Sequence, residues 1–195
     1  MTKVVLVIFI FLNAALYAEF IHFDTKEMTK HHNKLRKHYN SPALVYSKKL
    51  EDAAKKWVSV LQKDGCRMVH SHGKVGNYGE NIFWASPLTR IQTDSKGKSK
   101  RSSKIQTITP TQVSQAWYNE VEFYNYETNS CKKGEMCGHY TQVIWDTTKE
   151  IGCAALSCDD KSQVWVCEYF PAGNISMRYS DGRVKKLKPY QKNKN

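Results

Sequence analysis

The sequence predicts a single α+β domain that is cross-linked by disulfide bonds. Apolar residues recur at helical spacing through much of the first 120 residues, and two β-rich runs, 151–157 and 163–170, flank a short polar turn near the end. Six cysteines, an even number, accompany an N-terminal apolar run that is typical of exported proteins. A chain of 195 residues can bury one sizeable core, so we expect one domain.

The first 18 residues are predicted to be a signal peptide. Lys3 precedes the apolar run 4–12, and Ala18 supplies a small residue at the expected cleavage point. The run is too short for a membrane span, which needs about 20 apolar residues, and no later stretch is long enough. We therefore expect a secreted, extracellular protein (periplasmic in a bacterial host) without a transmembrane segment.

Three helices are expected before residue 120. Asp24 followed by Glu27 predicts a capping box at the start of the first helix. A second helix is predicted to begin at Ser47 and to end at Gly65. Thr109 followed by proline is a favourable start for a third helix. The predicted inward-facing residues are apolar: Met28, Leu35 and Tyr39; Leu50, Ala54, Trp57 and Leu61; Val113 and Trp117.

The hairpin near the end predicts one disulfide directly. Centring its turn on Asp160 places Cys153 opposite Cys167, and opposed residues of an antiparallel pair lie within disulfide range. A zinc site made of cysteines is disfavoured because no pair has Cys-x-x-Cys spacing. The other two disulfides follow from a short polar loop that a local bridge can close, and from elimination: Cys131–Cys137 and Cys66–Cys158.

The formal net charge of +12 is concentrated in two segments. Residues 86–108 are polar, basic and rich in serine, so we expect a surface insertion or a mobile loop. Residues 178–195 are expected to form a basic, flexible tail. Neither segment has the pattern of a recognition helix, so nucleic acid is not an expected partner. Acidic surfaces such as glycans or anionic lipids would attract both segments in a salt-dependent way.

Several short segments, in this order along the chain, resemble the CAP superfamily of cysteine-rich secretory proteins, antigen 5 and pathogenesis-related proteins. They are His32-Asn33-x-Leu35-Arg36, Val69-His70-Ser71 with Tyr78-Gly79-Glu80-Asn81-Ile82, Ala116–Glu120, Gly138–Trp145 and Val164–Ile175. Trp165 and Glu168 depart from the family pattern. The resemblance implies a three-layer α-β-α sandwich with a central antiparallel sheet, which we assign to residues 19–177. The cysteine spacing is similar to that of the plant branch.

The resemblance singles out His70, Glu80, Glu120 and His139 as a tetrad that converges in a surface cleft. Two imidazoles would ligate Zn²⁺ or another divalent cation directly, and the two carboxylates would orient water or a histidine N–H. The alternative is a hydrogen-bonded network that holds the cleft together without metal. His72 is a weaker accessory candidate, two residues from His70.

A second candidate site is aromatic. Tyr118, Phe123, Tyr124 and Tyr126 resemble the aromatic loop that sterol-binding members of the superfamily use, and flat rings suit a rigid apolar ligand. The alternative is that these rings belong to the core.

The resemblance implies a secreted binding protein rather than an enzyme, with sterols or other lipids as candidate ligands. One alternative is a metal-dependent hydrolase or protease, in which a bound ion would activate water. Against it, the cysteines are expected to be oxidised and the His-Glu-x-x-His pattern is absent. The other alternative is a defence or interaction module that binds a partner protein through surface loops.

Overall fold

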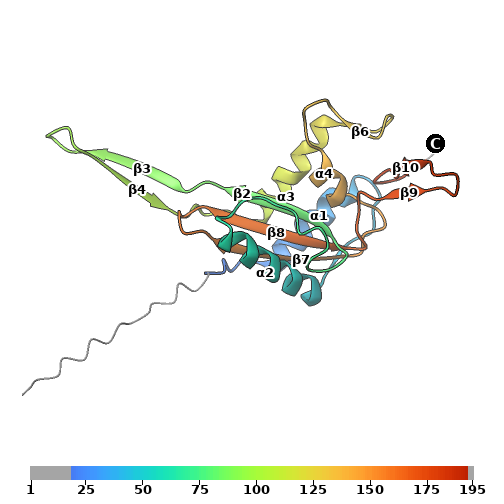
Figure 1. Cartoon of the computed structure of the whole chain (residues 1–195), viewed down its shortest axis with the longest axis horizontal. Helices are drawn as coiled ribbons and strands as arrows, with labels where there is room; N and C mark the ends of the chain where they lie inside the picture. The colour runs from blue at the N-terminus through green and yellow to red at the C-terminus, as the bar shows by residue number, and fades with distance from the viewer. Residues whose placement is uncertain (1–18, 193–195) are drawn as a thin grey trace, which may run out of the picture.

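The computed structural model describes residues 19–192, so the predicted signal peptide lies outside the described residues. A four-stranded sheet forms the middle of three layers, in the order β1 (Val45–Tyr46), β7 (Glu150–Ser157), β8 (Gln163–Phe170) and β2 (Gly79–Ala85) (Figure 1). The strands β7, β8 and β2 are antiparallel, as predicted, whereas β1 runs parallel to β7. The sheet is therefore mixed, which corrects the expectation of a wholly antiparallel sheet.

One face of the sheet is covered by α2 (Lys48–Lys63), which follows the predicted Ser47 and precedes Gly65 at a φ of 70°. Its apolar side packs on even-numbered positions of β8, because alternate strand residues face the same layer. The first turn of α2 lies directly on Gly152 of β7. A Cβ at that position would lie 2.2 Å from the Glu51 nitrogen, so only glycine fits there. The core of this layer contains Ala54, Trp57, Val58 and Leu61 against Leu156, Val164 and Val166.

The other face is covered by α1 (Thr25–Lys37), α3 (Pro110–Asn119) and the short α4 (Gly138–Val143), which the sequence reading did not predict. Their core includes Met28, Leu35, Val113, Trp117, Tyr140 and Val143 against Ile151, Trp165 and Tyr169. Trp165, a departure from the family pattern, is fully buried here.

The N-terminal caps of α3 and α1 differ in their side-chain contacts. Thr109 forms a full capping box with Gln112 at the start of α3. At α1, Asp24 caps the amide of Lys26, but the predicted reciprocal contact from Glu27 is wrong. The Glu27 carboxylate instead accepts hydrogen bonds from the amide and hydroxyl of Thr111, at 3.1 and 2.6 Å, and so ties α1 to α3. A contact between helices has replaced a contact within one.

All three predicted disulfides are confirmed. Cys153 and Cys167 face each other in the β7–β8 register, with Cα atoms 4.1 Å apart. The pair Cys66–Cys158 joins the end of α2 to the β7–β8 turn, and Cys131–Cys137 closes the loop before α4. No cysteine within residues 19–192 is free.

The two basic segments have more structure than expected. In place of a mobile loop, residues 86–108 contain the hairpin of β3 (Leu88–Thr93) and β4 (Ser99–Lys104), which projects from the body (Figure 1). In place of a flexible tail, the chain after residue 177 continues into the hairpin of β9 (Ser176–Arg178) and β10 (Val184–Lys186).

The end of that second segment is anchored by an aromatic side chain. The Tyr190 ring lies 4.7 Å from that of Tyr39 and 4.8 Å from that of Tyr126, measured between centroids. The segment is therefore ordered by packing on aromatic residues that are distant in sequence. The basic composition of the segment gave no sign of this packing.

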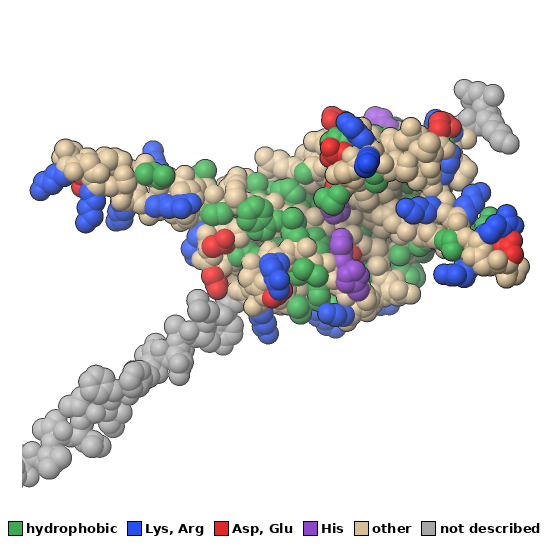
Figure 2. Space-filling model, turned by 45° about the horizontal axis from the view of Figure 1, so that its top comes forward, with side chains coloured by type: hydrophobic (Ala, Val, Ile, Leu, Met, Phe, Trp, Pro, Cys, Tyr) green, Lys and Arg blue, Asp and Glu red, His purple; other side chains and the backbone are tan. Residues whose placement is uncertain are grey.

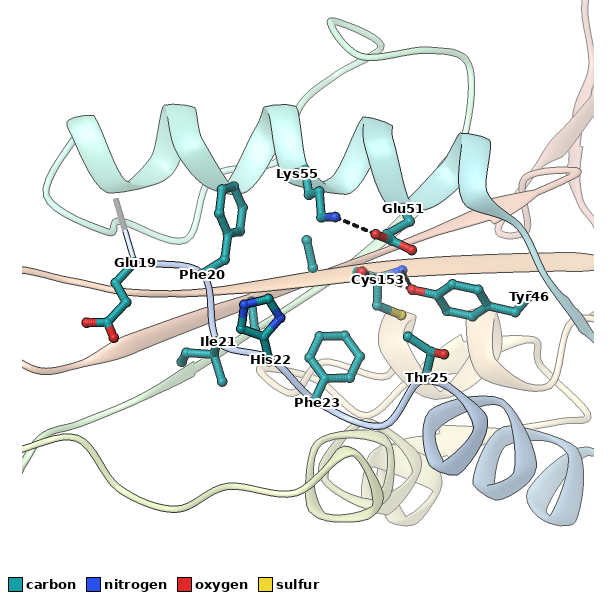
Figure 3. Close-up of a pocket in the computed structure, with 12 residues that line it drawn as sticks. Glu19, Phe20, Ile21, His22, Phe23, Thr25, Tyr46, Glu51, Lys55 and Cys153 are labelled. Atoms are coloured by element: carbon teal, nitrogen blue, oxygen red, sulfur yellow. Dashed lines mark hydrogen bonds and ion pairs between the residues drawn. The ribbon is translucent and has the colours of Figure 1, made fainter. Parts of the chain in front are cut away.

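The outer edge of β7 is paired in two pieces. β1 pairs with residues 150 and 151, and the segment around Phe20 pairs with residues 155–157. Between them the hydroxyl of Tyr46 contacts both the amide and the carbonyl of Cys153, at 3.3 and 3.2 Å (Figure 3). Within the described part of the chain, no helix is long and apolar enough to cross a membrane.

Candidate functional site

The four residues of the predicted tetrad come together from four different elements. His70 lies in the loop after α2, and Glu80 in β2. Glu120 begins the 3-10 helix η1 (Glu120–Phe123), and His139 lies in the first turn of α4. The His70 and His139 rings have centroids 6.4 Å apart. Histidine side chains are visible near the middle of the surface in Figure 2. The predicted convergence is therefore present.

Each histidine is held by one carboxylate. The Nδ1 of His70 lies 2.6 Å from Oε1 of Glu80, and the Nδ1 of His139 lies 2.6 Å from Oε1 of Glu120. An ionised carboxylate only accepts hydrogen bonds, so each Nδ1 carries a proton, and a neutral ring would carry its lone pair on Nε2. Within residues 19–192, neither Nε2 has a hydrogen-bond partner.

Glu120 also caps α4. Its second oxygen accepts hydrogen bonds from the amides of His139 and Tyr140, at 2.9 and 3.3 Å. A carboxylate at a helix N-terminus satisfies free amides and interacts favourably with the helix dipole. Glu120 thus positions both the backbone and the ring of His139.

The His70–Glu80 pair is asymmetric in exposure. The side chain of His70 is 49% exposed and that of Glu80 is 6% exposed. Burial alone would raise the pKa of Glu80, but hydrogen bonds from His70 and Ser71 outweigh it and leave the pKa below its ordinary value. The same hydrogen bond to Glu80 raises the pKa of His70. The pair therefore favours an ionised carboxylate beside an imidazole that protonates readily.

A fifth polar residue, Glu168, stands behind this pair. It is fully buried on β8, directly opposite Glu80 in the β2–β8 register. Neither oxygen of Glu168, nor Oε2 of Glu80, has a hydrogen-bond partner within the described residues. Burial, followed by the charge of Glu80, raises the pKa of Glu168 to about 9. Glu168 is therefore a neutral acid at pH 7 and has a proton to donate. In the sequence, the one indication that Glu168 belongs to the site is that it departs from the family pattern.

Two imidazoles are suitable direct ligands for a divalent ion. Zn–N bonds of about 2.0–2.1 Å place an ion so that two ligating rings have centroids roughly 5–6 Å apart. The observed centroids, 6.4 Å apart, are slightly farther apart than this range. Within residues 19–192, no group of three or more His, Cys, Asp or Glu side chains is arranged to hold an ion. The chain thus offers two direct ligands, and water would complete the coordination.

Two further histidines lie near the tetrad. The exposed ring of His72 is 6.4 Å from that of His70, measured between centroids. His32 is buried in α1, where its Nδ1 donates to the Met28 carbonyl and its Nε2 accepts from the Tyr169 hydroxyl. Burial lowers the pKa of His32 to about 4, so the ring is neutral at pH 7. We therefore assign His32 to the packing of the core.

The predicted aromatic site is occupied by contacts within the protein. The hydroxyl of Tyr118 is hydrogen-bonded to that of Tyr39, and the Tyr124 ring packs on Tyr140. Tyr126 packs on Tyr190, and the ammonium groups of Lys188 and Lys192 lie over its ring. Phe123 is half-buried. These contacts favour the alternative in which the rings support the fold.

An apolar hollow lies instead where the edge of β7 is interrupted (Figure 3). It has a volume of about 640 Å³ and lies between the segment 19–25, α2 and β7. Phe20, Ile21 and Phe23 form its apolar wall, and the ion pair between Glu51 and Lys55 lies on its α2 side (Figure 3). The hollow was not predicted from the sequence, because the walls of the hollow come from segments far apart in the chain.

Comparisons with known proteins agree with this fold. The sequence profile of the cysteine-rich secretory protein family, CAP, matches residues 29–169. The pathogenesis-related protein PR-1 of Medicago truncatula is 41% identical over 132 residues, which cover 67% of this chain and 64% of that protein. The pathogenesis-related protein PRMS of Zea mays is 40% identical over 134 residues, 68% of each chain.

A solved structure has a similar fold. The crystal structure of Na-ASP-1 is 26% identical, with a TM-score of 0.56 over 77% of this chain and 39% of that one. The expected three-layer fold is thereby confirmed. The chain spans just under two thirds of the Medicago protein, and the segment matched by the family profile contains the whole tetrad.

Proposed function

This chain belongs to the cysteine-rich secretory protein (CAP) family, and from that premise we propose that it is an exported binding protein whose His70/His139 cleft takes a divalent cation. Export is supported by the N-terminal apolar run and by three disulfides, which persist in oxidising compartments. Amino-terminal sequencing of protein recovered outside its producing cells tests export, and Glu19 is the expected first residue.

One observation carries the cation proposal. Both imidazoles are held through Nδ1 by a carboxylate, which leaves Nε2 of each ring as the nitrogen that can ligate an ion. Metal-ligating histidines in proteins are oriented in this way, with the other ring nitrogen donating to a carboxylate. Among residues 19–192, no protein group bonds to either Nε2, so both nitrogens are available to an ion.

Calorimetric titration with Zn²⁺ tests this proposal. The wild type should bind one ion, and His70→Ala/His139→Ala should lose that binding while keeping its fold. A matched control, His22→Ala/His38→Ala, removes two exposed imidazoles elsewhere and should bind zinc like the wild type. Equal zinc affinity in all three proteins would leave the tetrad as a metal-free structural network.

The expectation of a sterol or other lipid ligand has more support at the hollow beside β7 than at the aromatic segment. The hollow has an apolar wall and a volume suited to a small amphiphile. Binding of a fluorescent sterol and of a fluorescent fatty acid should weaken in Phe20→Ala, and should persist in Phe123→Ala. If Phe123→Ala weakened binding and Phe20→Ala did not, the lipid site would lie at the aromatic segment. Loss of neither signal would remove lipid from the proposed function.

A further inference from the structure

The hairpin β3–β4 projects from the body of the protein (Figure 1). Every residue from Arg90 to Lys104 is exposed, so no helix or strand of the body covers either face of the hairpin. A two-stranded hairpin gains little stability from such an arrangement. An exposed ribbon of this kind offers two faces to a partner.

The strand register sorts the side chains of the hairpin into two different faces. Residues directly opposed in an antiparallel pair project on the same side, and successive pairs alternate sides. The backbone bond from Asp94 to Lys98 extends the ladder by one pair. One face therefore carries a cation in every pair: Leu88/Lys104, Arg90/Ser102, Gln92/Lys100 and Asp94/Lys98. We call Arg90, Lys98, Lys100 and Lys104 the cationic ladder.

The opposite face is rich in hydroxyl groups. Thr89 lies beside Ser103 and Thr93 beside Ser99, with hydroxyl oxygens 3.2 and 2.9 Å apart. Arg101 is the cation of this face, opposite Ile91. Hydroxyl groups and charges along a narrow ribbon can hydrogen-bond to a polar chain laid along it.

Among the described residues, none of the four cations of the ladder takes part in an ion pair. Asp94 is the acidic residue of the hairpin, and its carboxylate accepts hydrogen bonds from the amides of Lys96 and Lys98 within the turn. The ion pairs found among residues 19–192 involve other cations. By contrast, Arg183 and Lys192 near the C-terminus are paired with Asp181 and Glu127. Figure 2 shows Lys and Arg side chains along the projecting hairpin.

We propose that the cationic ladder binds a linear acidic polysaccharide that carries carboxylate or sulfate groups. Successive pairs on one face of a strand are about 6.8 Å apart, so the ladder presents cations at regular intervals to an extended polyanion. The hairpin has no aromatic residue from Leu88 to Lys104 on which bases would stack, as single-stranded nucleic acids require. It also lacks the Trp, Tyr or Phe anchors that seat a protein at a lipid interface. This inference is independent of the cation proposed for the tetrad.

The test compares two charge variants of the full chain. Arg90→Gln/Lys100→Gln/Lys104→Gln removes three charges from the ladder. The control, Arg178→Gln/Lys185→Gln/Lys186→Gln, removes three exposed charges from the other basic hairpin. Binding to immobilised heparin and to polygalacturonate is measured at several salt concentrations, and circular dichroism verifies that both variants remain folded.

The ladder variant should bind at least one of the polysaccharides about tenfold more weakly, with a shallower salt dependence, because three of the four cations that face the polyanion are removed. The control should bind like the wild type. Equal losses in both variants would reduce the effect to net charge and overturn the proposal. So would the absence of binding to both polysaccharides, or binding that is tighter to phosphatidylglycerol vesicles or to DNA and is lost in the ladder variant.

Discussion

Glu80 and Glu168 oppose each other in the β2–β8 ladder, and three of their four carboxylate oxygens have no other hydrogen-bond partner among the described residues. Two ionised carboxylates would repel each other strongly in this buried setting, so one of them holds a proton. Glu80 is the ionised member because His70 and Ser71 donate hydrogen bonds to it. The His/Glu tetrad is thus extended by a neutral acid that the family pattern does not contain.

The first prediction concerns the pH dependence of stability. The pKa of Glu168 is raised in the folded state, from an ordinary value of 4.5 to about 9. The folded state therefore holds a proton that the unfolded state releases, and Glu168 stabilises the fold fully below about pH 4.5 and progressively less up to about pH 9. Glu168→Gln should keep a neutral donor and lose this pH dependence.

Urea unfolding at pH 5 and pH 8.5 measures the effect. The free energy of unfolding of Glu168→Gln relative to wild type should rise with pH, by on the order of 4 kcal/mol across this range. Glu122→Gln, at an exposed position, serves as the control and should follow the wild type. Parallel pH curves for Glu168→Gln and the wild type would show that Glu168 is ionised in the fold.

The second prediction concerns Glu120. Its carboxylate orients the His139 ring and caps α4, so Glu120→Ala should weaken zinc binding by about 10–100-fold, the usual cost of losing such a supporting partner. It should also lower the free energy of unfolding by about 1 kcal/mol through the lost cap. Calorimetry and denaturant unfolding measure the two effects separately. Unchanged zinc affinity together with lost stability would leave Glu120 with only its capping role.

The third prediction concerns Arg36, which is fully buried and has no carboxylate partner among residues 19–192. Its guanidinium donates to the carbonyl groups of Pro42, Val143, Trp145 and Thr148, at 2.8–2.9 Å. A lysine ammonium has fewer donors in a different geometry, so Arg36→Lys should leave carbonyls unpaired and lower the free energy of unfolding by about 3 kcal/mol.

The matched control is Arg67→Lys, an exchange at an exposed position in an ion pair with Asp64. It should change the free energy of unfolding by less than about 0.5 kcal/mol. If both exchanges had equally small effects in denaturant unfolding, the carbonyl contacts of Arg36 would be unimportant for stability.

The fourth prediction ranks two disulfides. Cys66–Cys158 closes a loop of 92 residues and Cys131–Cys137 one of 6. Loop-closure entropy then assigns them about 4.7 and about 2.3 kcal/mol of stabilisation, respectively. Replacing Cys66 and Cys158 by alanine should therefore shift the urea midpoint further than replacing Cys131 and Cys137. The opposite ranking would mean that native contacts around the small loop dominate over chain entropy.

Local features were predictable from the sequence. The β7–β8 hairpin and its disulfide follow from alternation and from a short turn, and the start of α3 follows from Thr109 and Pro110. In each case the interacting residues are near neighbours in the chain. The tetrad was reached through family motifs, because its members come from four separate elements.

Features that depend on distant contacts were missed. Glu27 leaves its local capping partner for Thr111, 84 residues away. The acid pair of Glu80 and Glu168 depends on strand register across 88 residues. The β3–β4 hairpin has too few apolar residues to show an alternating pattern, so its composition alone predicted a loop.

The hydroxyl of Tyr46 has a consequence for self-association. A strand at the edge of a sheet can pair with a strand of another molecule and so promote aggregation when its amides and carbonyls are free. Where the outer edge of β7 is interrupted, the Tyr46 hydroxyl hydrogen-bonds to both the amide and the carbonyl of Cys153. These two groups are therefore not free to pair with a strand of another molecule. The protein therefore keeps an opening beside β7 without offering the backbone of Cys153 as a template for aggregation.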